Sequence, residues 1–197
     1  MKNFLIYASF SILAGFTACN QQSNQAESVS TESLLETTDK VLQTGKAGTA
    51  IEYNDAVVGL QAKIIQEMLV VLNLQGKDPV ADLKHLTQTI IQSRDQLKTL
   101  QVYEGGLDLK KSADELFAFY QSACEGPWLK AFELYAAEGE KMSDEQSQQF
   151  LALLEEGSAN EKQFDDAFAI AQEAFSKQHG FAIVENELQG KIDKAGE

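Results

Sequence analysis

The sequence contains few residues that could cross-link the chain, bind a metal ion or interrupt a helix. Its 197 residues include only two cysteines, two histidines and two prolines. Two cysteines cannot build the disulfide framework that holds many small secreted domains together, so the folded part must rely on its own apolar core. The scarcity of proline favours long helices. The motifs of serine hydrolases, zinc proteases, phosphate-binding loops and c-type haem sites are missing, so we predict a non-enzymatic protein without a cofactor.

A long apolar run is also missing, and the one apolar segment lies at the amino terminus. A short basic start, Met1 to Asn3, precedes an apolar run from Phe4 to Phe16. The run is too short for a transmembrane helix, which needs about 20 apolar residues. The next charged residue is Glu27. This layout is typical of a secretory signal peptide, which we place at residues 1–18.

The end of this segment, Phe16-Thr17-Ala18-Cys19, resembles the bacterial lipobox. In that motif, small residues precede a cysteine that receives diacylglycerol and becomes the first residue of the mature protein. The resemblance implies that Cys19 is lipidated and anchors the chain to a membrane. Phe16 differs from the Leu that usually stands three residues before the cysteine. The alternative is an ordinary signal peptide that is cut near Ala18 and leaves Cys19 unmodified.

Polar residues follow Cys19 directly, and acidic residues outnumber basic ones along the chain. Residues 20–33 contain almost no apolar side chains, so they cannot bury enough surface to offset the entropy of ordering. We therefore predict a flexible tether over residues 19–48, in which Leu34, Leu35, Val41 and Leu42 allow at most one or two short amphipathic turns. The formal net charge is −14, and an acidic surface repels the phosphates of nucleic acids and of anionic lipids. We expect no nucleic-acid partner.

From residue 49 onward, apolar residues recur every three or four positions, which is the pattern of amphipathic helices. A capping box pairs a Ser or Thr side chain with an acid or amide three residues later and satisfies free backbone N–H groups. Three such boxes mark predicted helix starts in this part of the chain: Thr49 with Glu52, Ser112 with Glu115, and Ser143 with Gln146. Asp78 followed by Pro79 marks a fourth start. These signals predict helices that begin near residues 49, 78, 108 and 143.

Two of the four predicted helices contain an interruption. Gly126-Pro127 removes a backbone hydrogen bond from the third helix, and Gly157-Ser158 weakens the fourth. The apolar pattern continues in phase past both, so we favour a kink over a break at the first and one long helix with a weak point at the second. No stretch alternates as a strand does. The sequence therefore predicts an all-α, up-down-up-down four-helix bundle over residues 49–184 and a polar tail over residues 185–197.

Four residues are candidates for chemistry. Cys124 lies within an apolar helical pattern, so a small core residue is favoured over a reactive thiol. Met68 on the first helix and His85 on the second would be the ligands if the bundle held a haem or a metal ion, although Met at helical spacing is usually a core residue. His179 lies at a helix end beside a glycine.

Adjacent acidic residues occur in the last predicted helix, as Glu155-Glu156 and Asp165-Asp166. Neighbouring positions of a helix point in different directions, so the two carboxylates of such a pair diverge. We therefore expect these acidic residues to form a solvated face rather than a catalytic pair.

Several aromatic and polar positions resemble a known group of proteins. Glu52-Tyr53-Asn54 at the start of the first long helix and Phe117-Ala-Phe119-Tyr120 in the third are similar to small helical lipoproteins of Bacteroidetes and spirochaetes. The last helix adds Phe164, Phe168, Gln172, Phe175, Lys177 and Gly180-Phe181. Those proteins are catalogued as a leptospiral-type surface protein family, and the likeness covers most of residues 49–183. The family has no assigned activity, so the resemblance implies no catalytic residues.

Together these features predict a membrane-anchored envelope lipoprotein that binds a protein or small-molecule partner or acts structurally. The alternative is a haem- or metal-binding helical bundle with Met68 and His85 as ligands. Asn20-Gln21-Gln22 lacks the acidic run that resembles a surface-export signal in Bacteroidetes. We therefore expect an outer-membrane position that faces the periplasm, with the cell surface as the alternative.

Overall fold

The structure, a computed structural model, describes residues 16–19, 30–72 and 78–185. Within these ranges the helices are α1 (Thr31–Thr44), α2 (Ala50–Leu72), α3 (Pro79–Thr99), α4 (Leu107–Glu125), α5 (Pro127–Glu138), the short 3-10 helix η1 (Gly139–Lys141), α6 (Asp144–Ser158) and α7 (Glu161–His179). Two strands complete the described part: β1 (Phe16–Cys19) and β2 (Ala182–Glu185). The predicted all-α class is confirmed for the body of the protein. Most of the predicted signal peptide and polar tail lies outside the described residues.

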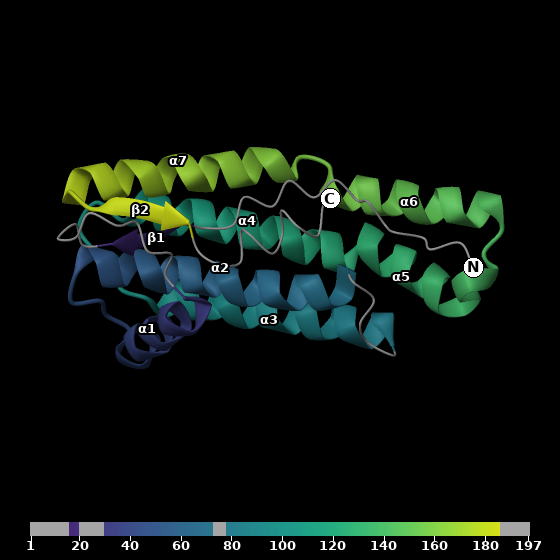
Figure 1. Ribbon diagram of the computed structural model, residues 1–197, viewed down its shortest axis with the longest axis horizontal. Coiled ribbons are helices and arrows are strands. Elements are labelled where there is room, and N and C mark those ends of the chain that lie inside the picture. The colour runs from purple at the N-terminus through teal and green to yellow at the C-terminus, as the bar shows by residue number, and fades with distance from the viewer. Residues whose placement is uncertain (1–15, 20–29, 73–77, 186–197) are drawn as a thin grey trace.

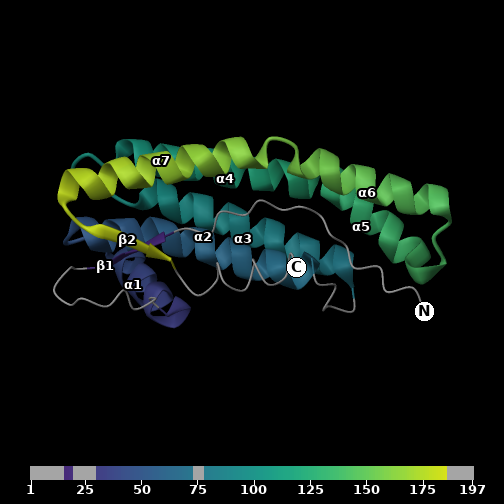
Figure 2. The same cartoon turned by 45° about the horizontal axis from the view of Figure 1, so that its top comes forward.

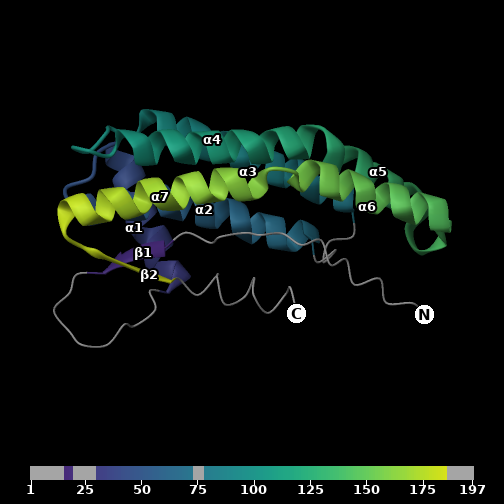
Figure 3. The ribbon, with the colours of Figure 1, turned by 90° about the horizontal axis from the view of Figure 1, so that it is seen from above.

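The helices form an elongated body in which the chain runs back and forth along the long axis (Figure 1). α2 and α3 lie side by side, and α3 also packs against α4 and α5. α4 and α5 follow one another along the axis, as do α6 and α7. As a result α7 packs on α4, whereas α6 packs on α5. The same order is visible in the turned views (Figures 2 and 3).

One face of each long helix forms the core, as the apolar periodicity predicts. On α2 the predicted stripe is buried, with at most 3% of each side chain exposed: Tyr53, Val57, Leu60, Ile64, Met68 and Val71. The stripe of α3 is buried to 1% or less: Leu83, Leu86, Ile90, Leu97 and Leu100. Leu74 continues the spacing of the α2 stripe in the sequence, but it lies outside the described residues.

Most of the predicted helix starts are confirmed by their hydrogen bonds. Thr49 Oγ1 accepts a bond from the N–H of Glu52 at 3.1 Å, and Glu52 Oε2 accepts one from the N–H of Thr49 at 3.1 Å. The predicted caps at residues 78 and 143 are also formed. The capping box predicted at Ser112 is wrong, because α4 already begins at Leu107 and Ser112 lies inside it.

Helix α1 lies within the segment that the sequence analysis assigned to a flexible tether. Ser30 caps it, and its buried residues lie on one face: Thr31, Leu34, Thr38 and Val41. This face packs against α2. After the helix, Gly45 O accepts a hydrogen bond from Gln101 N at 2.8 Å. The tether prediction is therefore wrong for residues 31–44, because tertiary packing supplies the apolar contact that the local composition lacks.

The contact between α1 and α2 depends on Gly59. A Cβ atom at this position would overlap the Oγ1 of Thr38, which is fully buried. That hydroxyl donates to Leu34 O at 2.8 Å and lies 3.1 Å from Asp55 O, so it has little freedom to move. The absence of a side chain at residue 59 is what allows the two helices to approach.

Replacing Gly59 with Ala should destabilise the protein, although Ala is normally the better helix former. We expect a loss of about 1–3 kcal/mol in the free energy of unfolding, because the added methyl group overpacks the contact with Thr38. Urea unfolding of Gly59→Ala, Thr38→Ala and the double variant measures the effect. The double variant should cost less than the sum of the two single variants. Stabilisation by Gly59→Ala alone would show that α1 does not pack as described.

Both predicted interruptions divide a helix. Gly126, with φ −117° and ψ −106°, separates α4 from α5, which begins at Pro127. Asn160, in the left-handed region with φ 74°, separates α6 from α7. The favoured kink at the first position and the one long helix at the second are therefore wrong, and the alternative of a break holds at Gly126. In both cases the two halves bury the same face, so the apolar phase continues although the run of backbone hydrogen bonds stops.

The strands β1 and β2 form an antiparallel pair that the all-helical prediction did not include. Phe16 lies opposite Glu185, and Cys19 lies opposite Ala182. β1 also packs against α2. The proposed processing site thus falls within a strand of the full-length chain. Cleavage immediately before Cys19 would remove three of the four residues of β1.

Candidate functional site

The structure separates the two residues that were considered as ligands of a haem or a metal ion. Met68 is fully buried on α2. The His85 side chain on α3 is 64% exposed, and its Nδ1 lies 2.9 Å from Glu67 Oε2. One side chain therefore belongs to the core and the other to the surface. Met68 and His85 therefore do not form a common ligand site for a haem or a metal ion.

The other histidine, His179, belongs to a cluster of rings at the end of α7. Its Nε2 lies 2.9 Å from Glu104 O, and its ring centroid lies 4.5 Å from that of Phe175. Close by, the hydroxyl of Tyr53 donates to Gly106 O at 3.1 Å, and burial raises the pKa of this phenol to about 12. These contacts join the connection between α3 and α4 to α7. They hold the end of the body together.

Cys124 lies in the core, as its sequence pattern predicts. The side chain is 2% exposed. Burial raises the pKa of its thiol to about 12, with hydrogen bonding to Thr87 acting in the opposite direction. Since the thiolate is the reactive form of cysteine, this residue has the character of a small apolar core residue and not of a nucleophile.

The interior also contains a row of polar groups that the sequence analysis did not identify. Six side chains from α2, α4 and α7, each at most 2% exposed, make up what we call the polar seam: Asn54, Gln61, Tyr120, Glu161, Asp165 and Gln172. On α2 the two members are seven residues apart, and on α7 the steps are four and seven. Those steps place each set on one helix face. Both α2 and α4 pack against α7, so the seam lies between these three helices.

One end of the polar seam is a neutral pair. Gln172 Nε2 on α7 donates to Asn54 Oδ1 on α2 at 3.0 Å. Both residues are almost completely buried, so the bond satisfies groups that would otherwise be costly to desolvate. A buried amide pair of this kind fixes the register of two helices, which is a structural role.

The other end of the polar seam is acidic. Glu161 and Asp165 are one turn apart on α7, and the hydroxyl of Tyr120 on α4 donates to Asp165 Oδ1 at 3.4 Å. Glu161 is 2% exposed, and within the described residues neither of its carboxylate oxygens has a hydrogen-bond partner. Two acidic groups therefore lie in the interior beside one phenol.

This environment disfavours ionisation of the residues concerned. Burial raises the pKa of Glu161 to about 8, and the neighbouring charge of Asp165 adds to the effect, while the nearby hydroxyl of Tyr120 acts in the opposite direction. Burial also raises the pKa of Tyr120 well above its ordinary value, with further contributions from Asp165 and Glu161. Each of the two carboxyl groups thus raises the pKa of the same phenol.

The sequence analysis placed these acidic residues on a solvated face. That prediction is correct for Asp166, whose carboxylate points outward to Lys162 at 2.8 Å. It is also correct for Glu155 and Glu156, which are exposed. It is wrong for Asp165, which is 1% exposed. A signal in the sequence could have revealed this burial. Glu161 falls in an otherwise apolar heptad phase, so it lies in the core if the helix packs along its whole length. Asp165 is one turn further along the same face.

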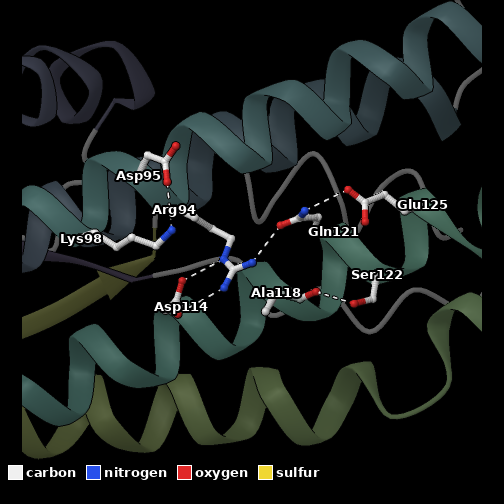
Figure 4. Close-up of polar contacts among 8 residues, drawn as sticks. All are labelled: Arg94, Asp95, Lys98, Asp114, Ala118, Gln121, Ser122 and Glu125. Carbon is white, nitrogen blue, oxygen red and sulfur yellow. Dashed lines mark hydrogen bonds and ion pairs between the residues drawn. The ribbon is translucent and has the colours of Figure 1, made fainter.

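A second polar network connects α3 with α4, on the side of α4 shown in Figure 4. Arg94, the sole arginine of the chain, donates through Nε to Asp114 Oδ1 at 2.8 Å and through Nη2 to Asp114 Oδ2 at 3.3 Å. Its Nη1 donates to Gln121 Oε1 at 2.8 Å, and Gln121 Nε2 donates to Glu125 Oε1 at 2.9 Å. The two-pronged bond to one carboxylate matches the planar geometry of arginine. The network clamps the two helices together.

Residues on which the family resemblance rests come into contact in the fold. Phe119 on α4 stacks on Phe164 on α7, with ring centroids 5.0 Å apart. The Asn54–Gln172 bond joins two further positions of the resemblance, and Tyr53 lies 5.5 Å from Phe175 between ring centroids. These positions therefore form the packing between α7 and its neighbours rather than a surface motif.

Comparison with protein-family models, with curated proteins and with solved structures found no match for this chain. Among the described helices, none combines the length and the apolar character that crossing a membrane requires.

Proposed function

We propose that the protein is a lipid-anchored lipoprotein of the bacterial cell envelope and that its helical body is a non-enzymatic binding or structural module. The observation that carries the proposal is the position of Cys19. It follows a signal-like apolar run and a short stretch of small residues, and polar sequence begins directly after it. The resemblance to small helical envelope lipoproteins supports the same conclusion.

The body has the properties that such a module needs. Its helices bury an apolar core, and its second cysteine, Cys124, is buried within that core. We propose an up-down-up-down bundle in which α2 and α3 are two of the four members. The consecutive helices α4–α5 form the third member and α6–α7 the fourth, and α1 is an additional helix against α2. Eleven residues separate Cys19 from Thr31, and they can span at most about 40 Å. The body would then remain close to the membrane surface.

The net charge of −14 favours a protein or small-molecule partner over nucleic acid. We propose an outer-membrane position that faces the periplasm, because Asn20-Gln21-Gln22 carries no acidic run. The haem alternative has no support from the positions of Met68 and His85, since one is buried and the other is exposed.

Replacing Cys19 with Ser tests the anchor. The variant should lose its lipid and no longer sediment with the membrane fraction, because a hydroxyl at this position cannot take the thioether-linked diacylglycerol. Fractionation after expression in a bacterium that processes lipoproteins, together with incorporation of labelled palmitate, measures both effects. Cys124→Ser is the matched control and should keep both the label and the membrane association. Membrane association and labelling that persist in Cys19→Ser would contradict the proposal.

A further inference from the structure

We propose that Glu161, Asp165 and Tyr120 form a binding site for one hard divalent cation of the Ca²⁺ or Mg²⁺ class. The site lies inside the body, between α4 and α7, at the amino-terminal end of α7. This inference is independent of the lipid anchor. It would hold for the soluble body as well as for the anchored protein.

The charge of the site is the first argument. Glu161 and Asp165 expose 2% and 1% of their surface, and no salt bridge to Glu161 is formed by the described part of the chain. The nearest lysine in sequence, Lys162, points outward and pairs with Asp166 at 2.8 Å. Buried carboxylates are compensated in proteins by a cation, by a metal ion or by protonation. Here the basic side chain next to the site is already engaged at the surface.

The available oxygen atoms are the second argument. Both oxygens of Glu161 are buried without a hydrogen-bond partner in the described residues, so both remain available as ligands. Asp165 and Tyr120 lie within 3.4 Å of each other and supply carboxylate and phenol oxygens. Residues four apart on a helix project from the same face, so the two carboxylates converge on the phenol. Hard cations such as Ca²⁺ and Mg²⁺ prefer carboxylate oxygens and complete their coordination with other oxygen ligands, including water.

The position of the site within the fold is the third argument. α6 and α7 are separated at Asn160, whose φ of 74° ends the continuous run of helix directly before Glu161. Tyr120 is fully buried on α4 and pairs across to α7. The ligands thus come from two helices and lie next to the joint between α6 and α7. A bound cation would fix α7 to α4 at this joint.

Thermal unfolding of the EDTA-treated protein with added Ca²⁺ or Mg²⁺ at pH 8 tests the proposal. A ligand at 100 times its dissociation constant should raise the melting temperature by about 5–10 °C in a protein of this size. The rise should be lost in Glu161→Gln and in Asp165→Asn, both of which keep the shape of the side chain. Glu156→Gln on the exposed face of α6 is the matched control and should keep the full response. Equilibrium dialysis with radioactive Ca²⁺ should give one ion per chain.

Two results would overturn the inference. The first is no response to either ion in protein that circular dichroism shows to be folded, because a proton would then be enough to neutralise the buried carboxyl group of Glu161. The second is a response that Glu161→Gln retains in full, because the ion would then bind elsewhere. Neither result bears on the lipid anchor, which the Cys19→Ser experiment tests separately.

Discussion

Glu161→Gln is expected to raise the stability of the protein at pH 8 and above and to leave it almost unchanged near pH 5. The pKa of Glu161 is raised from 4.5 to about 8 in the folded state, chiefly by burial. Between these pH values the folded state binds more protons than the unfolded state, so stability falls as pH rises. The stabilising contribution is present below pH 4.5 and is lost as pH rises through about 8. Since one pKa unit corresponds to about 1.4 kcal/mol, the loss amounts to at most roughly 5 kcal/mol.

Urea unfolding between pH 5 and pH 9 in metal-free buffer measures this effect. The difference in unfolding free energy between Glu161→Gln and the unaltered protein should grow with pH, because the amide cannot ionise. Glu156→Gln, at an exposed position on α6, should show no such growth. Parallel stability curves for Glu161→Gln and the unaltered protein would mean that the carboxyl group of Glu161 does not lie in the buried environment described.

Phe168→Ala is expected to cost about 3–5 kcal/mol of unfolding free energy, which is the range for a large aromatic side chain removed from a packed core. Phe168 lies on α7 between the acidic end and the amide end of the polar seam, and it is 2% exposed. A loss of this size is a large fraction of the 5–15 kcal/mol that domains usually possess. The variant should therefore unfold at a much lower urea concentration.

Ile170→Ala, two residues away on the same helix, is the control. Its side chain is 67% exposed, so its removal should change the stability by no more than about 0.5 kcal/mol. Equal losses for the two variants would show that the buried and exposed faces of α7 have been assigned incorrectly.

Local signals predicted where most helices begin and which faces they bury. The capping bonds at Thr49 and Ser143 involve residues three positions apart, so the sequence alone contains the whole interaction. The stripes of α2 and α3 follow from helical periodicity in the same way. Periodicity reports which face is buried, however, and it does not report whether the backbone is continuous. For that reason the apolar phase favoured continuity at Gly126 and Asn160, where the helices are in fact separate.

The remaining differences arise from contacts between residues far apart in the sequence. α1 has few apolar residues, and it is ordered because Thr38 fits against Gly59 on another helix. Likewise, Asp165 appears in the sequence as one of two adjacent surface acids, and only the packing of α7 on α4 brings it to Tyr120. A chain read without its tertiary partners cannot distinguish a buried carboxylate from a solvated one.

Intact-mass and peptide mass spectrometry of the protein extracted from bacterial envelopes tests the central claim most directly. The account predicts a mature chain whose first residue is Cys19 and whose amino-terminal peptide carries the mass of a diacylglyceryl group. Residues 1–18 should be absent from that form. A freely soluble protein with an unmodified sulfur at residue 19 would contradict the account, whether or not the signal peptide had been removed.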